Sequence, residues 1–206
     1  VKIFRENFVS LPHLMKGVSA DGILLDLGLS SFQVEKEERG FSFKGEGPLD
    51  MRMDQRMDQT AADLISHLSL EELEYTLFHY GEESWAKKIT KAIVHERERE
   101  PIETTQTLRK IVHHAIPRRF HSRKIDPATK TFQALRIKVN DELENLRKIL
   151  ETGWTLLKKE GRMCIISFHS LEDRMVKETF RRLEKEGKMR ILTKKQETHS
   201  EEEKKR

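Results

Sequence analysis

The sequence lacks the features that mark several classes of protein. Its 206 residues contain a single cysteine, Cys164, which can form neither an internal disulfide nor a cysteine-based zinc site. That excludes a disulfide-stabilised secreted scaffold and indicates a reducing compartment. No apolar run approaches the roughly 20 residues that cross a bilayer, and the N-terminus has no signal-peptide core. We therefore expect a soluble, cytoplasmic protein that does not contact membranes.

Common catalytic and metal-binding motifs are missing as well. The sequence has no Walker loop, no His-Glu-x-x-His pair and no nucleophile elbow. His113 and His114 are adjacent on an expected helix and point in different directions, which is poor geometry for a shared ion. We expect no metal site.

Charge gives a mild hint about a partner. Lysine and arginine total 39 against 35 for aspartate and glutamate, a formal net charge of +4. Hydrophobic and charged residues each make up 36% of a chain long enough for one sizeable domain, or a domain with an insertion. The basic excess fits a nucleic-acid partner but does not by itself identify one.

The two ends of the sequence have the pattern of an α/β domain. Nearly continuous apolar runs at 20–28 and 161–168 predict buried strands, the first apolar on both faces as in a parallel sheet. A helical pattern from about Phe132 to Lys158 precedes the second run, and another helix starts near Leu171. Residues 1–4 and, more weakly, 189–193 are further strand candidates. This alternation predicts an α/β fold.

Between about Met51 and Thr131 the sequence predicts helices only. Thr60 with Asp63, and Ser69 with Glu72, have the spacing of capping boxes at helix starts. Apolar residues then recur at three- and four-residue steps, which indicates an inserted helical domain.

Two polar clusters follow the predicted strands, where ligands bind in doubly wound sheets. They span residues 26–33 and 167–174. Asp26 can accept hydrogen bonds from an amine or a hydroxyl, although a turn or helix-cap role is equally compatible with the sequence. His169 and Ser170 have an alternative too, because Ser170 with Asp173 matches a capping box.

Two other segments are candidates for binding. The loop 39–54 mixes glycines, aromatic residues, Arg52, Asp50 and Asp54, which favours a binding loop; alternatively, Arg52 pairs with Asp50 or Asp54 and only ties the loop down. Residues 117–124 place four cations around Phe120, which could stack on a base. A solvated surface would look the same. The cationic candidates are Lys87, Lys88, Lys91, Arg118, Arg119, Arg123 and Lys124.

Six stretches, in order and spacing, together resemble one family. They are DGILLDLGLSS (21–31), RGFSF (39–43), PLDMRMD (48–54), GEE (81–83), ATKTFQALRIKVN (128–140) and SFHSLEDR (167–174). The chain resembles the RsmH (MraW) methyltransferases, which use S-adenosylmethionine to methylate the exocyclic N4 of a cytidine in small-subunit (16S-type) ribosomal RNA.

The resemblance implies a class I methyltransferase (Rossmann-like) core, residues 1–50 and 132–206, with a helical substrate-recognition domain inserted at 51–131. It implies cofactor contacts at Phe8, Asp26 and Gln33. Phe32 stands where members commonly have proline. The glycine-rich loop that opens such a core is not found before Asp26. We therefore expect an N-terminally incomplete core, with a further basic segment beyond Arg206.

An acceptor for the N–H groups of the cytosine amine would favour the implied reaction, although a formal general base is unnecessary where the product proton leaves to water. Asp26, Ser30 and Ser31 are the first candidates, and Asp50, Asp54 and His169 the second. One alternative is a non-catalytic RNA-binding remnant of such an enzyme. Another is a methyltransferase of the same fold that acts on DNA or a small amine. The expected partner is ribosomal RNA in the small subunit, and the sequence does not indicate an oligomeric state.

Overall fold

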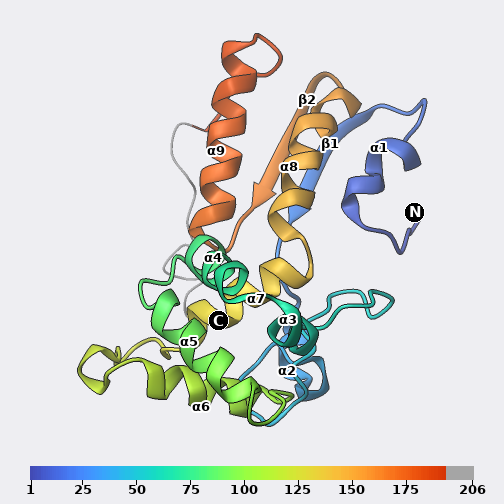
Figure 1. Ribbon diagram of the computed structural model, residues 1–206. Helices are drawn as coiled ribbons and strands as arrows, with labels where there is room; N and C mark the ends of the chain where they lie inside the picture. The colour runs from blue at the N-terminus through green and yellow to red at the C-terminus, as the bar shows by residue number, and fades with distance from the viewer. Residues whose placement is uncertain (194–206) are drawn as a thin grey trace. The chain divides into compact units, whose positions relative to one another are not determined.

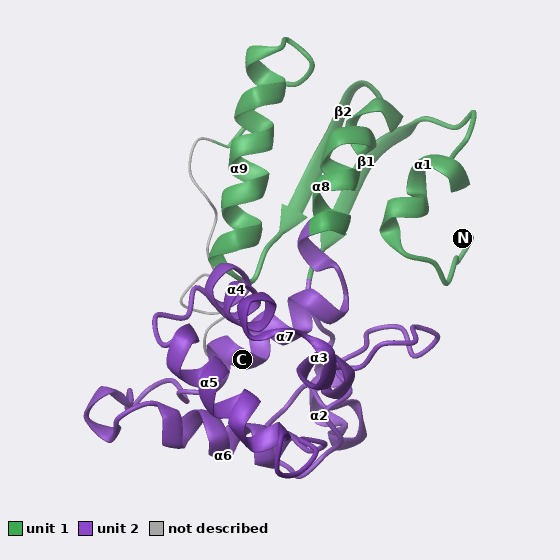
Figure 2. Ribbon diagram, in the orientation of Figure 1, with its two compact units in different colours: residues 1–27, 144–206 green, residues 28–143 purple. Residues whose placement is uncertain are grey.

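The computed structural model describes residues 1–193, and the predicted polar tail at 201–206 lies outside them. This part of the chain mixes helices with a two-stranded sheet (Figure 1). It divides into two compact units (Figure 2). We call Val1–Leu27 with Glu144–Arg206 the strand unit, and Gly28–Leu143 the helical unit.

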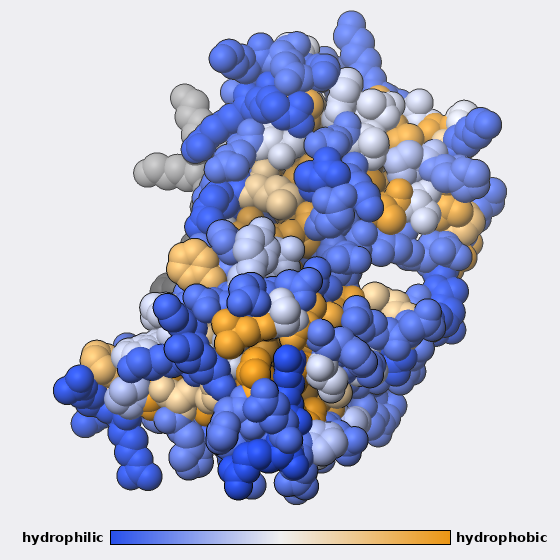
Figure 3. Space-filling model, viewed as in Figure 1, coloured by the Kyte–Doolittle hydropathy of each residue, from blue (hydrophilic) through white to orange (hydrophobic). Residues whose placement is uncertain are grey.

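Hydrophilic residues cover most of the surface that Figure 3 shows, with hydrophobic residues in patches between them. Charged residues make up 36% of the chain, which accounts for this surface. No helix in the described residues is long and apolar enough to cross a membrane.

The elements follow one another along the chain. They are α1 (Leu11–Leu14), β1 (Ala20–Asp26), α2 (Ser31–Glu35), α3 (Ala61–His67), α4 (Leu70–Gly81), α5 (Ala86–Arg97), α6 (Thr105–Ala115), α7 (Thr129–Val139), α8 (Glu142–Thr152), β2 (Leu157–Ile166) and α9 (Ser170–Lys185). Short 3-10 helices occupy Phe8–Ser10, Glu37–Arg39, Arg118–Phe120 and Gly153–Leu156.

The sheet of the strand unit consists of β1 and β2, which are parallel as predicted. Asp26 pairs in register with Ile166, and Ile23 with Met163. Ile23 and Leu25 belong to one apolar cluster with Leu146 and Ile149 of α8, and Met175, Val176 and Phe180 of α9 pack against the same cluster. This face of the sheet is the core of the unit.

The opposite face of β1 is open, which corrects the prediction that both faces are buried. Leu24 is 65% exposed, whereas its neighbours Ile23 and Leu25 are 8% and 6% exposed. Alternate residues of a strand point to opposite faces, and residues of α1, α8 and α9 all pack on the Ile23 side of this sheet. The apolar run therefore predicted the strand correctly but did not predict how many of its faces are covered.

The helical unit is built around α3 to α7, and both predicted capping boxes are present. Thr60 is the N-cap of α3 and Ser69 the N-cap of α4. The hydroxyl of each accepts from the backbone N–H three residues later, and the carboxylate of that later residue accepts from the N-cap's own N–H. The apolar positions then face one core, which includes Leu64, Leu73, Leu77, Ile89, Ile93, Leu108, Val112 and Leu135. Most helix stability in such a unit comes from packing this shared face.

The helical unit is larger than the insertion expected at 51–131. Phe41, Phe43 and Leu49 precede that range and Phe132 follows it, yet all four pack in the core of the helical unit. Composition changes near Met51, but burial is decided by which side chains meet in space. Its assignment as a substrate-recognition domain remains a prediction.

Three local predictions are wrong. Residues 1–4 and 189–193 form no strand, and Val1 and Ile3 are almost fully exposed. The helix predicted over 132–158 is two helices, α7 and α8, separated at Asn140 and Asp141, where Asp141 has a φ of 48°. Lys158 belongs to β2. Strands need a partner for their backbone groups, and apolar content alone does not supply one.

Candidate functional site

In the strand unit, the carboxyl ends of β1 and β2 lie side by side. Asp26 is opposite Ile166, and the Leu27 N–H donates to the Ile166 carbonyl at 3.1 Å. The first members of the two polar clusters, Asp26 and Ser167, are therefore neighbours, as predicted. The Asp26 side chain is exposed, and no hydrogen bond or ion pair within residues 1–193 engages its carboxylate. It caps no helix, because Ser30 starts α2.

His169 follows β2 and is held at the start of α9. Its side chain is 8% exposed, and Nδ1 accepts from the Glu172 N–H at 3.4 Å. Nε2 lies 3.3 Å from Oε1 of the buried Glu172, whose Oε2 accepts from the Phe168 N–H at 2.8 Å. The predicted cap at Ser170 is wrong: His169 is the N-cap and Ser170 the first helical residue. The imidazole thus fixes the turn after β2.

Phe8 lies in the same unit, at the start of the 3-10 helix Phe8–Ser10. Its ring is half-buried and packs against the apolar cluster that contains Ile23 and Leu25. The Asn7 side chain caps this turn by accepting from the Val9 N–H at 3.0 Å.

Ser30, Ser31 and Gln33 lie in the helical unit, at the start of α2. Ser30 and Gln33 form a capping box: Gln33 N–H donates to Ser30 Oγ at 3.3 Å, and Ser30 N–H donates to Gln33 Oε1 at 3.0 Å. Ser31 is exposed as the first residue of the helix. Two of the predicted site residues therefore also shape the turn, a role that the Ser-x-x-Gln spacing signals and that was not predicted.

The carboxylates of the loop 39–54 are both engaged by arginines. Asp50 binds Arg52 through two side-chain contacts of 2.8 and 2.9 Å, which confirms the alternative that Arg52 ties the loop down. Burial raises the pKa of Asp50, but hydrogen bonds and charge from Arg52 more than offset it, so the net pKa lies below its ordinary value. Asp54 pairs instead with Arg56 at 2.6 Å.

Two residues given no role from the sequence hold this loop in shape. The buried Asn140 accepts from the Met53 N–H at 2.7 Å and donates to the Met51 carbonyl at 2.8 Å. The Arg39 guanidinium donates to the Arg52 and Met53 carbonyls. Asn140 is the last residue of the stretch 128–140, one of the six that carry the family resemblance. Its place in that stretch was the sequence signal that could have indicated its role.

The two predicted cationic segments meet at one point, where Lys88 lies over the Trp85 ring and Arg119 over the Phe120 ring. The loop 117–124 follows the end of α6, and its Phe120 ring lies 5.0 Å from Trp85, at the start of α5. We call the seven cations together with Phe120 the basic face: Lys87, Lys88, Lys91, Arg118, Arg119, Phe120, Arg123 and Lys124. Within the described chain, none of these cations pairs with a carboxylate.

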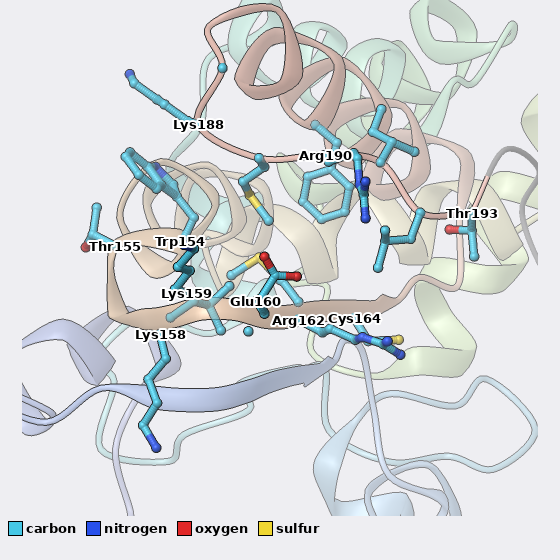
Figure 4. Close-up of a pocket in the computed structure, with 18 residues that line it drawn as sticks. Trp154, Thr155, Lys158, Lys159, Glu160, Arg162, Cys164, Lys188, Arg190 and Thr193 are labelled. Atoms are coloured by element: carbon cyan, nitrogen blue, oxygen red, sulfur yellow. The ribbon is translucent and has the colours of Figure 1, made fainter.

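A separate cavity of about 970 Å³ lies in the strand unit, between β2, the end of α9 and residues 187–193. Figure 4 shows its basic lining, including Lys159, Arg162 and Arg190. Lys158 points away toward β1, where its Nζ meets Asp21 at 2.9 Å. None of the predicted site residues lines this cavity.

Comparison with known proteins identifies a family and relatives that match most of the chain. The sequence model of the MraW methylase family matches residues 1–206. Ribosomal RNA small subunit methyltransferase H of Desulforapulum autotrophicum is 55% identical over 190 residues, 89% of this chain and 60% of the relative. The protein of the same name from Trichlorobacter lovleyi is 53% identical, over 85% of this chain and 57% of the relative.

The chain thus spans about three fifths of the length of the curated relatives that it matches. Identity of this extent, together with a match to residues 1–206, confirms the resemblance seen in the six sequence stretches. The chain belongs to the MraW methylase family.

Proposed function

We propose that this chain belongs to a cytoplasmic enzyme that methylates the exocyclic N4 of a cytidine in small-subunit ribosomal RNA, with S-adenosylmethionine as donor. The observation that carries the proposal is the Asp26 carboxylate, which has no partner within residues 1–193, at the adjacent carboxyl ends of two parallel strands. The family and the names of its relatives support the reaction class.

The residues of the strand unit fit a class I methyltransferase core and its cofactor. Asp26 offers an acceptor at the strand ends that no other described residue engages, and Phe8 offers an aromatic ring in the same unit. In the helical unit, Gln33 already uses its Oε1 in the capping box, which leaves its Nε2 for a ligand. When bound, the cofactor supplies an electrophilic methyl group, and the protein's task is to position the acceptor nitrogen.

Asp26 is the best acceptor for the cytosine amine. The amine lone pair is delocalised into the ring, and a carboxylate that accepts its N–H favours the pyramidal nitrogen that can attack. Asp50 and Asp54 are already paired with Arg52 and Arg56, which makes them poorer acceptors for a ligand than Asp26. Because the His169 imidazole is buried at the start of α9, we assign it to positioning the turn. Ser30 and Ser31 remain secondary candidates.

The basic face fits RNA as the partner. Seven cations without carboxylate partners in the described chain can neutralise phosphates. In a duplex the target amine is paired and stacked, so the enzyme needs an unpaired or splayed cytidine.

The test is methyl transfer to small ribosomal subunits by this chain joined to the segments of the Desulforapulum autotrophicum relative that it does not cover. Asp26→Asn is expected to lower kcat by about a hundredfold or more while the KM for RNA stays unchanged. Asp21→Asn on the same strand is the matched control. Undiminished transfer by Asp26→Asn would remove Asp26 from the reaction, and transfer to duplex DNA or a free amine would change the substrate class.

The alternative is a non-catalytic RNA-binding chain, favoured by the fact that the basic face requires no cofactor. Calorimetric titration of S-adenosylmethionine into the folded 206-residue chain separates the two. Saturable binding supports a methyltransferase site in this chain. RNA binding without cofactor binding, here and in the extended chain, supports the alternative.

A further inference from the structure

The partly buried Trp85 and the exposed Phe120 form an aromatic pair beside the cations of the helical unit's basic face. Their ring centroids are 5.0 Å apart at an interplanar angle of 50°. Lys88 Nζ lies 4.7 Å from the Trp85 centroid, and the Arg119 guanidinium lies 4.9 Å from that of Phe120. Phe120 is 53% exposed. The arrangement is a cation, two aromatic rings and a second cation in contact.

Each ring is held by its own backbone. The Trp85 N–H donates to Oε1 of the buried Glu83 at 2.8 Å, which fixes the start of α5. Phe120 ends a 3-10 turn in which its N–H donates to the Pro117 carbonyl at 2.9 Å. The adjacent His121 anchors the loop through Nε2 to the Ile116 carbonyl at 2.8 Å. The pair is therefore positioned before any ligand arrives, which lowers the entropy cost of binding.

From this juxtaposition we propose that the Trp85–Phe120 pair is a stacking platform for an unpaired nucleobase of the RNA, with Trp85 as a binding residue. A base stacks on the Phe120 face that Arg119 now covers, and the Arg119 guanidinium moves to the outer side of the base or to its phosphate. Lys88 and its neighbours hold the flanking phosphates. Aromatic rings and guanidinium planes are the usual stacking partners of unpaired bases.

The inference rests on the proposed RNA partner and adds which form of RNA is bound. In a duplex, each base is stacked between its neighbours and offers no free face to the pair. The platform thus selects single-stranded segments beside the target cytidine and acts on binding rather than on the reacting amine.

Trp85 fluorescence tests the platform directly. In a Trp154→Phe background, Trp85 is the only tryptophan, since the chain has two. Titration with single-stranded RNA of about 12 nucleotides is expected to give saturable quenching, and a duplex of the same sequence much weaker quenching. RNA binding without a change in Trp85 fluorescence would overturn the platform while leaving the RNA partner intact. Quenching by a polyglutamate peptide but not by RNA would also overturn it.

Phe120→Leu separates stacking from a structural role of the ring. It is expected to weaken binding of single-stranded RNA by about tenfold, with Phe120→Tyr restoring it. The slope of log Kd against log salt stays unchanged, because no cation is removed. Phe78→Leu, at an exposed ring of similar accessibility on α4, is the matched control.

Two results with Phe120→Leu would contradict the proposal. Unchanged affinity would show that the ring does not stack on RNA. A loss of affinity with a reduced salt slope would show that Phe120 only keeps the loop cations in place. Failure of the unchanged chain to bind any RNA would overturn both the platform and the proposed RNA partner.

Discussion

Asn140 illustrates how one side chain fixes a loop that is distant in sequence. Its amide serves Met51 and Met53 through two hydrogen bonds, and its residue is 6% exposed. Met51 has a φ of 62°, a conformation that non-glycine residues rarely adopt. The loop at 51–53 therefore keeps its shape because Asn140 satisfies its backbone.

Asn140→Ala is expected to lower the free energy of unfolding by about 2 kcal/mol, because it leaves the part-buried Met53 N–H and the buried Met51 carbonyl without this partner. Urea denaturation measures the change. Gln59→Ala, at an exposed position of the same unit, is the control. If Asn140→Ala lowers the free energy of unfolding no more than the control does, water replaces the amide as the partner of the two backbone groups.

Asp126 anchors the segment that follows the basic face. Its carboxylate accepts from Arg109 at 2.7 Å, from the Ala128 N–H at 2.8 Å and contacts His113 Nε2 at 2.9 Å. Burial raises the pKa of Asp126, but these hydrogen bonds and the charge of His113 lower it by more. The net pKa therefore lies below the ordinary value. The ionised form is thus favoured in the folded state.

The resulting stability is present above the unfolded pKa of about 3.9 and is lost as the pH falls through the lower folded value. Asp126→Asn is expected to cost about 1–3 kcal/mol at pH 7, and the difference from the unchanged chain shrinks below about pH 4. Urea unfolding at pH 7, 5 and 3 measures it, with Asp58→Asn as control. A constant difference across this range would exclude the carboxylate charge as the cause.

At the scale of elements, the loop 39–54 depends on a close backbone approach at Gly40. A Cβ at this position would lie 2.2 Å from the Pro48 carbonyl oxygen and 2.7 Å from the Asp50 nitrogen. Gly40 has a φ of 68°, and Gly187, after α9, has a nearly identical φ of 69° with no atom within 4 Å of the added Cβ. The two glycines share a backbone conformation and differ in the space around it.

Gly187→Ala is expected to cost about 1 kcal/mol, the penalty of a left-handed conformation alone. Gly40→Ala should cost about 3 kcal/mol or more, since the backbone around Pro48 must also move. Chemical denaturation measures both. Equal losses would mean that the loop relaxes freely around the methyl group.

The starts of α3 and α4 could be predicted from the sequence, whereas the strand predictions for residues 1–4 and 189–193 were wrong. The capping boxes at Thr60 and Ser69 depend on residues three positions apart, so they are readable locally. The N-cap of α9 was missed because the His169 imidazole, rather than the Ser170 hydroxyl, accepts the N–H of Glu172. Residues 1–4 have strand-like composition and no neighbouring strand.

At the scale of the molecule, the basic face joins cations from two distant segments. Lys87, Lys88 and Lys91 lie on α5, and the others lie in the loop after α6, more than 25 residues later. The contact of Trp85 with Phe120 brings Lys88 and Arg119 to one region, which the net charge of +4 does not reveal. Binding to RNA should therefore depend steeply on salt.

Replacing Lys87, Lys88 and Lys91 by alanine is expected to reduce the magnitude of the slope of log K against log salt by about 2 for single-stranded RNA, about 0.7 for each phosphate that is no longer neutralised. Fluorescence anisotropy between low and moderate salt measures it. Lys44→Ala, an exposed lysine outside the basic face, is the control. An unchanged slope would show that α5 does not meet phosphates.

The sequence by itself determined the parallel strands, the helical segment and the family, because these depend on local periodicity and on short motifs. Only the tertiary structure decided which of the candidate carboxylates has no partner in the described part of the chain. Arg52 lies two residues from both Asp50 and Asp54, so the sequence left its partner open. In the structure Arg52 pairs with Asp50, in a loop whose backbone Asn140 and Arg39 hold by hydrogen bonds. The contact of Trp85 with Phe120 likewise depends on how α5 and α6 pack, because side chains that are far apart in sequence meet only through the core that both helices share.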